Sequence, residues 1–247
     1  MTSHVHLVPT LAGAAAGSEV VVEGAEAHHA VAVRRIAVGE ELVLTDGAGA
    51  WARCEVAATG KQRLVATVLE LEGTPEPSPV LEVVQALPKG DRGELAVEVL
   101  TEIGVARVVP WAAARSVAVW RGERAAKSLA KWRATAREAA KQARRAWHPQ
   151  VDELASTDQV TAHLAAAPLA LVLHEEATAS LAEALDGGVP ERVVLVVGPE
   201  GGLAPEELAA FEAAGARSVR LGTEVLRTST AGLAAASAVL SRTGRWG

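Results

Sequence analysis

A change of pattern near residue 75 constrains the fold of this 247-residue chain more than any other feature. Residues 19–72 alternate like short strands separated by glycines, whereas residues 80–241 alternate between apolar strand-like runs and longer helical runs. Strand–helix alternation is typical of a parallel sheet with helices on both faces. Between the two patterns lies TPEPSP at 74–79, and its closely spaced prolines predict a stiff linker. We therefore expect two domains, 1–73 and 80–247.

The first domain is predicted to be a small β-barrel with one helix, over residues 25–37, because short strands at this spacing with glycine turns are typical of barrels. The second domain is predicted to be an α/β domain. Its strand-like runs are 80–87, 107–111, 169–174, 193–198 and 218–222, and its helical runs are 91–103, 123–146, 154–165, 178–186, 205–214 and 230–241.

Composition excludes several classes of protein. A single cysteine, Cys54, excludes a disulfide framework within the chain and a multi-cysteine zinc site. The adjacent His28 and His29 lack Cys, Asp or His partners at ligand spacing, so no metal is expected. The N-terminal stretch lacks the basic region of a signal peptide, and no apolar run reaches ~18 residues. We expect a cytoplasmic protein that does not span a membrane.

Positive charge is concentrated in one segment of a chain whose net charge is −6. Residues 107–145 hold 11 basic and 2 acidic residues, a local charge of +9, which leaves −15 on the rest of the chain. On a helical wheel, the cations of 124–145 occupy one arc and alanines, Leu129 and Trp132 the other. Like charges at i,i+4 repel, and a polyanion such as RNA would relieve that repulsion. A solvated surface face is the alternative interpretation.

Two glycine-rich loops follow strand-like runs and precede helical runs in the C-terminal third. They are GPEGG at 198–202 and LGTEVLRTSTAG at 221–232. Ligands bind open α/β sheets at the carboxyl ends of strands, and glycine lets backbone approach a ligand closely. Neither loop continues into a phosphate-binding Gly-Lys-Ser/Thr pattern, and no GxGxxG begins the domain. GPEGG alone is equally compatible with an ordinary strand-to-helix turn.

Together the two loops resemble the C-terminal signature of the SPOUT methyltransferases, the trefoil-knotted class that binds S-adenosylmethionine (SAM). In particular they resemble the ribosomal RNA small subunit methyltransferase E family, which methylates a uridine at N3. Leu226, Arg227 and Thr228 match the family's LGxxILRTETA pattern, whereas Ser229 stands where the family usually has Glu. The resemblance implies a trefoil-knotted SPOUT domain with a parallel sheet and helices on both faces, preceded by a PUA-like β-barrel.

The resemblance also implies the cofactor site. SAM is expected to be held largely by backbone groups of three loops, about 173–175, 198–202 and 221–228. Arg227 is a catalytic candidate that would stabilise negative charge on the base, and Glu200 is a candidate for accepting its proton. The expected cofactor-binding residues are Leu173, His174, Gly198, Pro199, Glu200, Gly201, Gly202, Leu221, Gly222, Val225, Leu226, Arg227 and Thr228.

Three further segments resemble the same family. Two of them lie in the second domain: LPKGDRGELAVEVLTEIGV at 87–105, in which Val99 replaces a lysine of the family, and EAAKQARRAWHPQV at 138–151. The third, residues 28–52, resembles the PUA-like barrel. They carry cations that could meet RNA phosphates, although polar helix starts look the same in sequence. The expected RNA-binding residues are Arg35, Lys89, Arg92, Arg115, Arg137, Lys141 and Arg145.

The function that the resemblance implies is SAM-dependent methylation of a uridine at N3 in 16S ribosomal RNA of the small ribosomal subunit. It also implies a homodimer, to which the alanine-rich face of 230–241 could contribute. Two alternatives stay open: ribose 2′-O methylation by another knotted enzyme, and a non-catalytic RNA-binding or ribosome assembly protein. Ser229 and Val99 are the residues that favour the second alternative.

Overall fold

The computed structural model describes residues 4–246 of the chain. They form two compact units, each discontinuous in sequence. The first unit comprises the residues up to Glu76 together with Ala140–His148, and the second comprises Pro77–Ala139 together with the residues from Pro149 onward. The sequence alone had placed 140–148 in the second domain.

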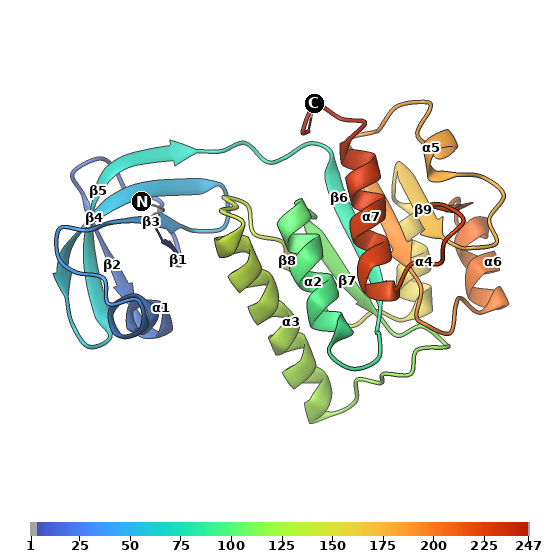
Figure 1. Cartoon of the computed structure of the whole chain (residues 1–247), viewed down its shortest axis with the longest axis horizontal. Helices are drawn as coiled ribbons and strands as arrows, with labels where there is room; N and C mark the ends of the chain where they lie inside the picture. The colour runs from blue at the N-terminus through green and yellow to red at the C-terminus, as the bar shows by residue number, and fades with distance from the viewer. Residues whose placement is uncertain (1–3, 247) are drawn as a thin grey trace. The chain divides into compact units, whose positions relative to one another are not determined.

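The first unit is a curled five-stranded sheet in the order β1-β3-β4-β5-β2 (Figure 1). Apart from the parallel pair β1 and β3, neighbouring strands are antiparallel. Irregular register between β4 and β5 bends these long strands, and the inner face holds an apolar core around Leu42, Leu44 and Leu64. The strands are β1 (Val5–Leu7), β2 (Glu19–Glu23), β3 (Glu41–Thr45), β4 (Ala50–Thr59) and β5 (Arg63–Gly73).

The helix of the first unit is shorter than predicted from the sequence. It consists of α1 (Gly24–His28) and one π-helical turn, η1 (His29–Val33), instead of running to residue 37. Arg35 ends it with a left-handed φ of 57°, and the Ile36 N–H then donates to the Ala30 carbonyl at 3.1 Å. A residue in the left-handed conformation commonly ends a helix, and that residue is usually glycine. The sequence therefore does not indicate that the helix ends at Arg35.

The segment 140–148 belongs to the first unit because its side chains and backbone pack on the barrel. The Lys141 ammonium lies 2.8 Å from the Glu26 carboxylate, and the Trp147 indole N–H donates to the Thr74 carbonyl at 2.8 Å. The Gly49 N–H donates to the Ala146 carbonyl at 2.9 Å. These contacts join residues far apart in the sequence, so periodicity does not reveal them.

The second unit contains a six-stranded parallel sheet in the order β11-β9-β10-β6-β7-β8. Its strands agree with the predicted runs to within a few residues, except that the two-residue β8 was not expected. They are β6 (Val80–Ala86), β7 (Arg107–Trp111), β8 (Gln150–Val151), β9 (Leu169–Leu173), β10 (Arg192–Val197) and β11 (Arg217–Val219).

Helices cover both faces of this sheet, as the strand–helix alternation predicts (Figure 1). Along β10, Val193, Leu195 and Val197 face a core shared with α2, α7 and the first part of α3. Val194 and Val196 face the opposite core, which contains α4 and α6. The helices are α2 (Arg92–Ile103), α3 (Glu123–Gln142), α4 (Thr157–Ala165), α5 (Leu181–Ala184), α6 (Pro205–Ala213) and α7 (Thr228–Leu240).

Within residues 4–246, no helix is both long enough and apolar enough to cross a membrane. Across the same range, no group of three or more His, Cys, Asp or Glu side chains is placed to hold a metal ion.

Candidate active site

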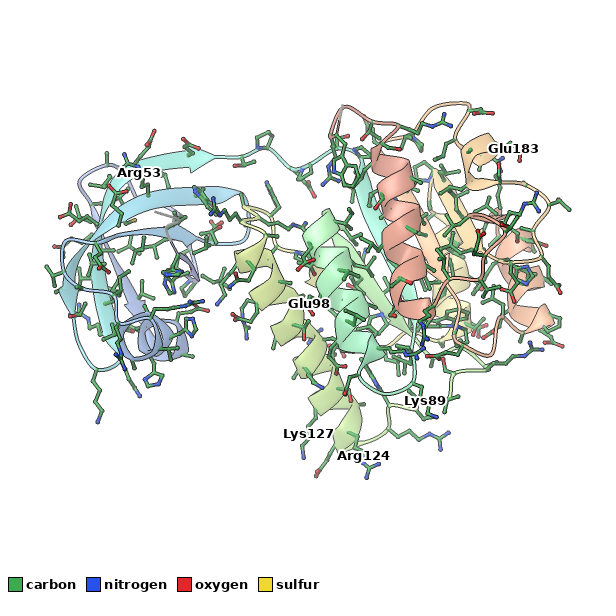
Figure 2. All side chains as sticks on the ribbon, viewed as in Figure 1. Arg53, Lys89, Glu98, Arg124, Lys127 and Glu183 are labelled. Atoms are coloured by element: carbon green, nitrogen blue, oxygen red, sulfur yellow. The ribbon has the colours of Figure 1, made fainter. Side chains whose placement is uncertain are left out.

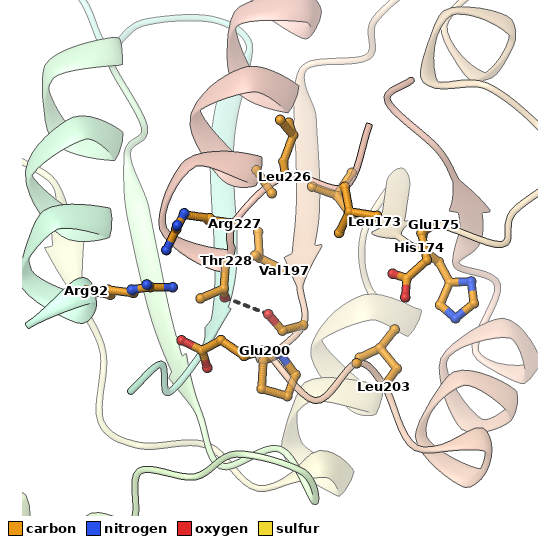
Figure 3. Close-up of a pocket in the computed structure, with 15 residues that line it drawn as sticks. Arg92, Leu173, His174, Glu175, Val197, Glu200, Leu203, Leu226, Arg227 and Thr228 are labelled. Carbon is orange, nitrogen blue, oxygen red and sulfur yellow. Dashed lines mark hydrogen bonds between the residues drawn. The ribbon is translucent and has the colours of Figure 1, made fainter. Parts of the chain in front are cut away.

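A cavity of about 260 Å³ opens at the carboxyl ends of β9 and β10, where parallel sheets bind ligands (Figure 3). Three loops that are distant in sequence line it: the turn after β9, the GPEGG loop after β10, and the end of the loop that leads into α7. The lining residues are Arg92, Leu173, His174, Glu175, Val197, Gly198, Pro199, Glu200, Gly202, Leu203, Val225, Leu226, Arg227, Thr228 and Ala231.

A smaller cavity of about 90 Å³ adjoins the first and shares Leu173, His174 and Leu226 with it. Its outer wall is the loop after β11, including Leu221 and Gly222. Of the residues that the sequence indicates for a cofactor, all except Gly201 line one of the two cavities. We call the two cavities together the cofactor cavity.

Gly201 has a different reason to be glycine. A Cβ built at this position would meet the Arg115 Cβ and the Arg115 carbonyl oxygen, each at 3.2 Å. The Arg115 guanidinium also donates to the Gly201 carbonyl at 3.4 Å. Glycine at position 201 therefore allows the GPEGG loop to pack closely against the segment that contains Arg115. Gly202 needs glycine for its conformation, because its φ is +71°.

Thr228, the first residue of α7, ties the loops to the sheet. Its hydroxyl donates to the Gly198 carbonyl at 2.6 Å and accepts from the Gln85 amide at 3.2 Å. Gln85 is fully buried near the end of β6, and its amide also lies 3.4 Å from the Thr228 carbonyl. The sequence analysis did not single out Gln85. An amide inside a strand that is apolar apart from Glu82 is the signal that could have revealed it.

Glu207 is a second supporting residue that sequence reasoning missed. Its position suits an exposed acid in the first turn of α6, yet it is only 4% exposed. Its carboxylate accepts from the Ala114 N–H at 2.8 Å, the Ala204 N–H at 3.1 Å and the Thr157 hydroxyl at 3.1 Å. A buried carboxylate requires such partners, and here they fix the segment before Arg115 against the start of α6.

Charged side chains lie on both sides of the cofactor cavity. Arg92 and Arg227 approach one another above Glu200, whereas Glu175 lies on the far side with His174 (Figure 3). One Glu200 carboxylate oxygen accepts the Lys89 N–H at 3.1 Å, which fixes the GPEGG loop against the loop before α2. Among the described residues, neither guanidinium has an ion pair or hydrogen bond with another side chain. Both are available to a bound anionic or carbonyl group.

The structure does not support Lys141 as an RNA contact. Its side chain is 7% exposed and pairs with Glu26, which also contacts His6 Nδ1 at 3.4 Å. Burial by itself raises the pKa of the Glu26 carboxyl, but hydrogen bonds and charges from His6 and Lys141 outweigh burial and lower this pKa to about 2. The helical wheel placed Lys141 among the exposed cations, because a wheel does not show contacts with other elements such as the barrel residue Glu26.

The other predicted RNA contacts lie in varied surroundings. Arg35, Lys89, Arg115 and Arg137 are exposed, Arg92 lines the cofactor cavity, and Arg145 is half-buried. Two further cations of α3 support the fold: Lys131 pairs with Glu94 at 2.9 Å, and Arg133 pairs with Glu153 at 2.9 Å.

Three exposed cations of the basic segment lie near the start of α3. Arg121, Arg124 and Lys127 are exposed and form no ion pair within residues 4–246. Figure 2 shows Arg124 and Lys127 at this end of the helix, with Lys89 at the same end of the second unit. Part of the local charge is therefore paired with acidic side chains, whereas Arg121, Arg124 and Lys127 stay unpaired among the described residues near the start of α3.

Comparisons with known proteins cover both units. Residues 74–240 match a family model described as an RNA methyltransferase domain, and residues 22–69 match one described as an RNA methyltransferase PUA domain. Ribosomal RNA small subunit methyltransferase E of Mycobacterium tuberculosis is 50% identical over 93% of this chain and 89% of its own length. The protein of the same name from Bacillus subtilis is 31% identical over 90% of each chain.

Solved structures match over almost the whole chain. Ribosomal RNA small subunit methyltransferase E from Neisseria gonorrhoeae, bound to S-adenosyl methionine, superposes with a TM-score of 0.86 at 26% identity, over 97% of this chain and 98% of the other. A Legionella pneumophila protein in complex with SAM gives a TM-score of 0.89 at 26% identity, over 98% of both chains.

Proposed function

The chain belongs to the ribosomal RNA small subunit methyltransferase E family, and from this premise we propose that it methylates N3 of a uridine in 16S ribosomal RNA. The resemblance of the glycine loops to this family is confirmed. The predicted fold class, a SPOUT methyltransferase domain after a PUA-like domain, is also confirmed. The family fixes the class of reaction, and the choice of atom and nucleotide is our proposal.

The residues of the cofactor cavity fit S-adenosylmethionine. SAM supplies a methyl group on a positively charged sulfur, already activated for transfer to a nucleophile. Apolar side chains of Leu173, Leu203 and Leu226 offer surfaces for the adenine ring, and the loop backbones offer donors and acceptors. Arg92 and Arg227 suit the cofactor's carboxylate or the charge that develops on the substrate.

The chain itself must orient the uridine and remove its N3 proton. Proximity and orientation can contribute a large part of the acceleration of a displacement of this kind. We assign the proton to the Glu200 carboxylate, and we assign to Arg227 the stabilisation of negative charge on the base. Ser229, where the family usually has Glu, is buried in the first turn of α7 and is not among the described residues that line the cavity. Serine in place of glutamate at position 229 therefore leaves the carboxylate of Glu200 in the cavity.

We further propose that the substrate is the small ribosomal subunit or its RNA, in the cytoplasm. The relatives are named for that RNA, the first unit matches a PUA domain, and exposed cations lie at Arg35, Lys89 and the start of α3. Phosphate contacts made by such cations fix the position of an RNA without reading its sequence.

One observation carries the proposal: three loops from separate parts of the chain converge on one cavity that also contains Glu200, Arg92 and Arg227. Its test is to incubate the protein with SAM carrying a labelled methyl group and either small subunits or free 16S RNA. Label should enter the RNA, and calorimetry should show SAM binding. SAM binding without label transfer to either substrate would favour the non-catalytic alternative.

A homodimer is the expected assembly, and we propose that α7 contributes to it. One face of α7 packs on α2 and β10, while Leu233, Ala234, Ser237 and Ala238 are only half-buried. Small side chains of this kind allow a second helix to approach closely. Sedimentation at micromolar concentration should give the mass of two chains, and a monomer would contradict the proposal.

A further inference from the structure

A third cavity meets the cofactor cavity at Arg92 and Glu200. It has a volume of about 710 Å³ and is open to solvent along one side. We call it the outer cleft, and its lining residues are Lys89, Gly90, Asp91, Arg92, Leu95, Val117 and Glu200. Because both cavities share Arg92 and Glu200, a group bound in the outer cleft lies next to the place where a cofactor would be held.

The walls of the outer cleft combine apolar surface with a charged edge. Leu95 and Val117 are 43% and 65% exposed, although they are large hydrophobic residues. Their surfaces suit the face of a flat ring, which gains free energy when it leaves water. The Arg92 guanidinium provides N–H donors at the inner edge, and Glu200 provides a carboxylate acceptor beside them.

We propose that the outer cleft binds the target uracil base, turned out of the RNA. Leu95 and Val117 contact the ring, Arg92 donates to a carbonyl oxygen beside N3, and Glu200 accepts the N3–H. Enzymes that modify bases in RNA or DNA commonly read an extruded base in this way, through its pairing edge and through apolar contacts. This proposal rests on the proposed function and specifies how that function selects its base.

The assigned roles balance the reaction. The N3–C bond forms as the S–C bond of the methyl donor breaks, and the N3 proton passes to the Glu200 carboxylate. The positive charge of the sulfonium and the negative charge of Glu200 both disappear, and the Arg92 guanidinium holds the imide oxygen throughout. Glu200 and Arg92 are therefore catalytic residues in this assignment, and Leu95 and Val117 are positioning residues.

The same geometry predicts a preference for uracil over cytosine. Uracil N3 carries a proton that a carboxylate can accept, whereas cytosine N3 presents a lone pair that a carboxylate repels. Two NMR titrations test this preference in the full-length protein saturated with S-adenosylhomocysteine, one with uridine 5′-monophosphate and one with the cytidine analogue. Uridine monophosphate should bind about tenfold more tightly. Equal affinity for the two nucleotides would overturn the proposal.

Variants of the apolar wall locate the binding site. Leu95→Asp and Val117→Asp place a charge against the ring and should weaken uridine monophosphate binding by about tenfold or more, with SAM affinity unchanged. Leu71→Asp is the matched control, because Leu71 is an exposed leucine of β5 in the first unit, next to Glu70 and Glu72. Wild-type uridine monophosphate affinity in both wall variants would show that the base binds elsewhere.

Glu200→Gln tests the reading of N3 independently of turnover. A glutamine amide can accept from uracil N3–H or donate to cytosine N3, so the uridine preference should fall toward unity. A preference as strong as that of the wild type would remove Glu200 from the proposal.

The experiments also distinguish an error in the assignment of the outer cleft from an error in the proposed function. Unmutated protein that still transfers methyl groups to N3, while these three variants keep wild-type nucleotide binding, would refute only the cleft.

Discussion

Arg35 holds a backbone conformation that normally belongs to glycine. Its φ of 57° is needed to end the π-helical turn η1, and its side chain is exposed. A non-glycine residue in this region costs about 1 kcal/mol or more. Strained conformations of this kind cluster at functional sites, and contact with RNA is the role that we propose for Arg35.

Two substitutions separate the strain at Arg35 from its charge. Arg35→Gly and Arg35→Ala should both weaken RNA binding, because each removes a cation. Arg35→Gly should be about 1 kcal/mol more stable than Arg35→Ala, since only glycine relieves the left-handed conformation. Chemical unfolding and filter binding measure the two effects. RNA affinity equal to that of the wild type in both variants would leave Arg35 without the proposed role.

The buried pair of Lys141 and Glu26 should make the first unit sensitive to acid. The folded-state pKa of Glu26 is lowered to about 2 from an ordinary value of 4.5. A lowered carboxyl pKa contributes stability above pH 4.5, and that contribution is lost as the pH falls from 4.5 towards 2.

Lys141→Met removes the cation and leaves a half-buried carboxylate beside His6. We expect a loss of about 2–3 kcal/mol at pH 7, measured by chemical unfolding, with little change in RNA affinity once the protein is folded. The loss should shrink below pH 4.5 as Glu26 becomes protonated. Arg137→Met on the exposed side of α3 is the control and should cost under about 0.5 kcal/mol. A Lys141→Met variant as stable as this control would contradict the account.

Some residues of the candidate site could be predicted from the sequence. The glycine loops and the arginine before α7 could be located because their spacing is a sequence pattern. Gln85 and Glu207 were not singled out, and Lys141 was expected to contact RNA, because each of the three has a partner more than 90 positions away. Arg92 was predicted to contact RNA, and the structure places it in a cavity with Glu200.

At the scale of elements, the GPEGG loop depends on the segment around Arg115. The space beside Gly201 is occupied by Arg115 and not by open cavity. Gly201→Val should therefore shift the loop and weaken SAM binding by about tenfold without unfolding the domain. The matched control is Gly187→Val, because a Cβ at Gly187 would meet no atom within 4 Å. Calorimetry that gives equal SAM affinity for the wild type and Gly201→Val would contradict this dependence.

Helix α3 has two ends with different roles. Lys141 near its end pairs inside the first unit, whereas Arg124 and Lys127 near its start are exposed without ion pairs among the described residues. The amphipathic pattern correctly predicted that Leu129, Trp132 and Ala136 are buried. It could not show that Lys131, Arg133 and Lys141 have acidic partners, because Glu94, Glu153 and Glu26 lie outside α3.

RNA binding should therefore depend on the start of α3. The double variant Arg124→Glu/Lys127→Glu should bind RNA more weakly. It should also lower the slope of log affinity against log salt by about 2, one for each phosphate that the protein no longer neutralises. Arg217→Glu/Arg242→Glu changes the net charge equally at other sites of the second unit and serves as the control. Equal losses in both variants would indicate a general charge effect and not a contact surface.

At the scale of the whole molecule, each unit has its own apolar core, and the candidate active site lies entirely within the second. The pattern change near residue 75 predicts two domains of different architecture, and the structure divides into two compact units with different sheets. The return of residues 140–148 to the first unit was not predictable, because hydrogen bonds such as those of Trp147 and Gly49 connect distant segments. The family resemblance supplied the reaction, and the structure supplied the arrangement of its groups.

The identity of the methylated nucleoside tests the central claim most directly. Small-subunit RNA treated with the protein and SAM is digested to nucleosides, and these are separated and identified by mass spectrometry against synthetic standards. We predict 3-methyluridine at a single position, and its loss when Glu200→Gln replaces the wild-type protein. A methyl group on the ribose 2′-oxygen, on another base atom, or on no nucleoside at all would contradict the account.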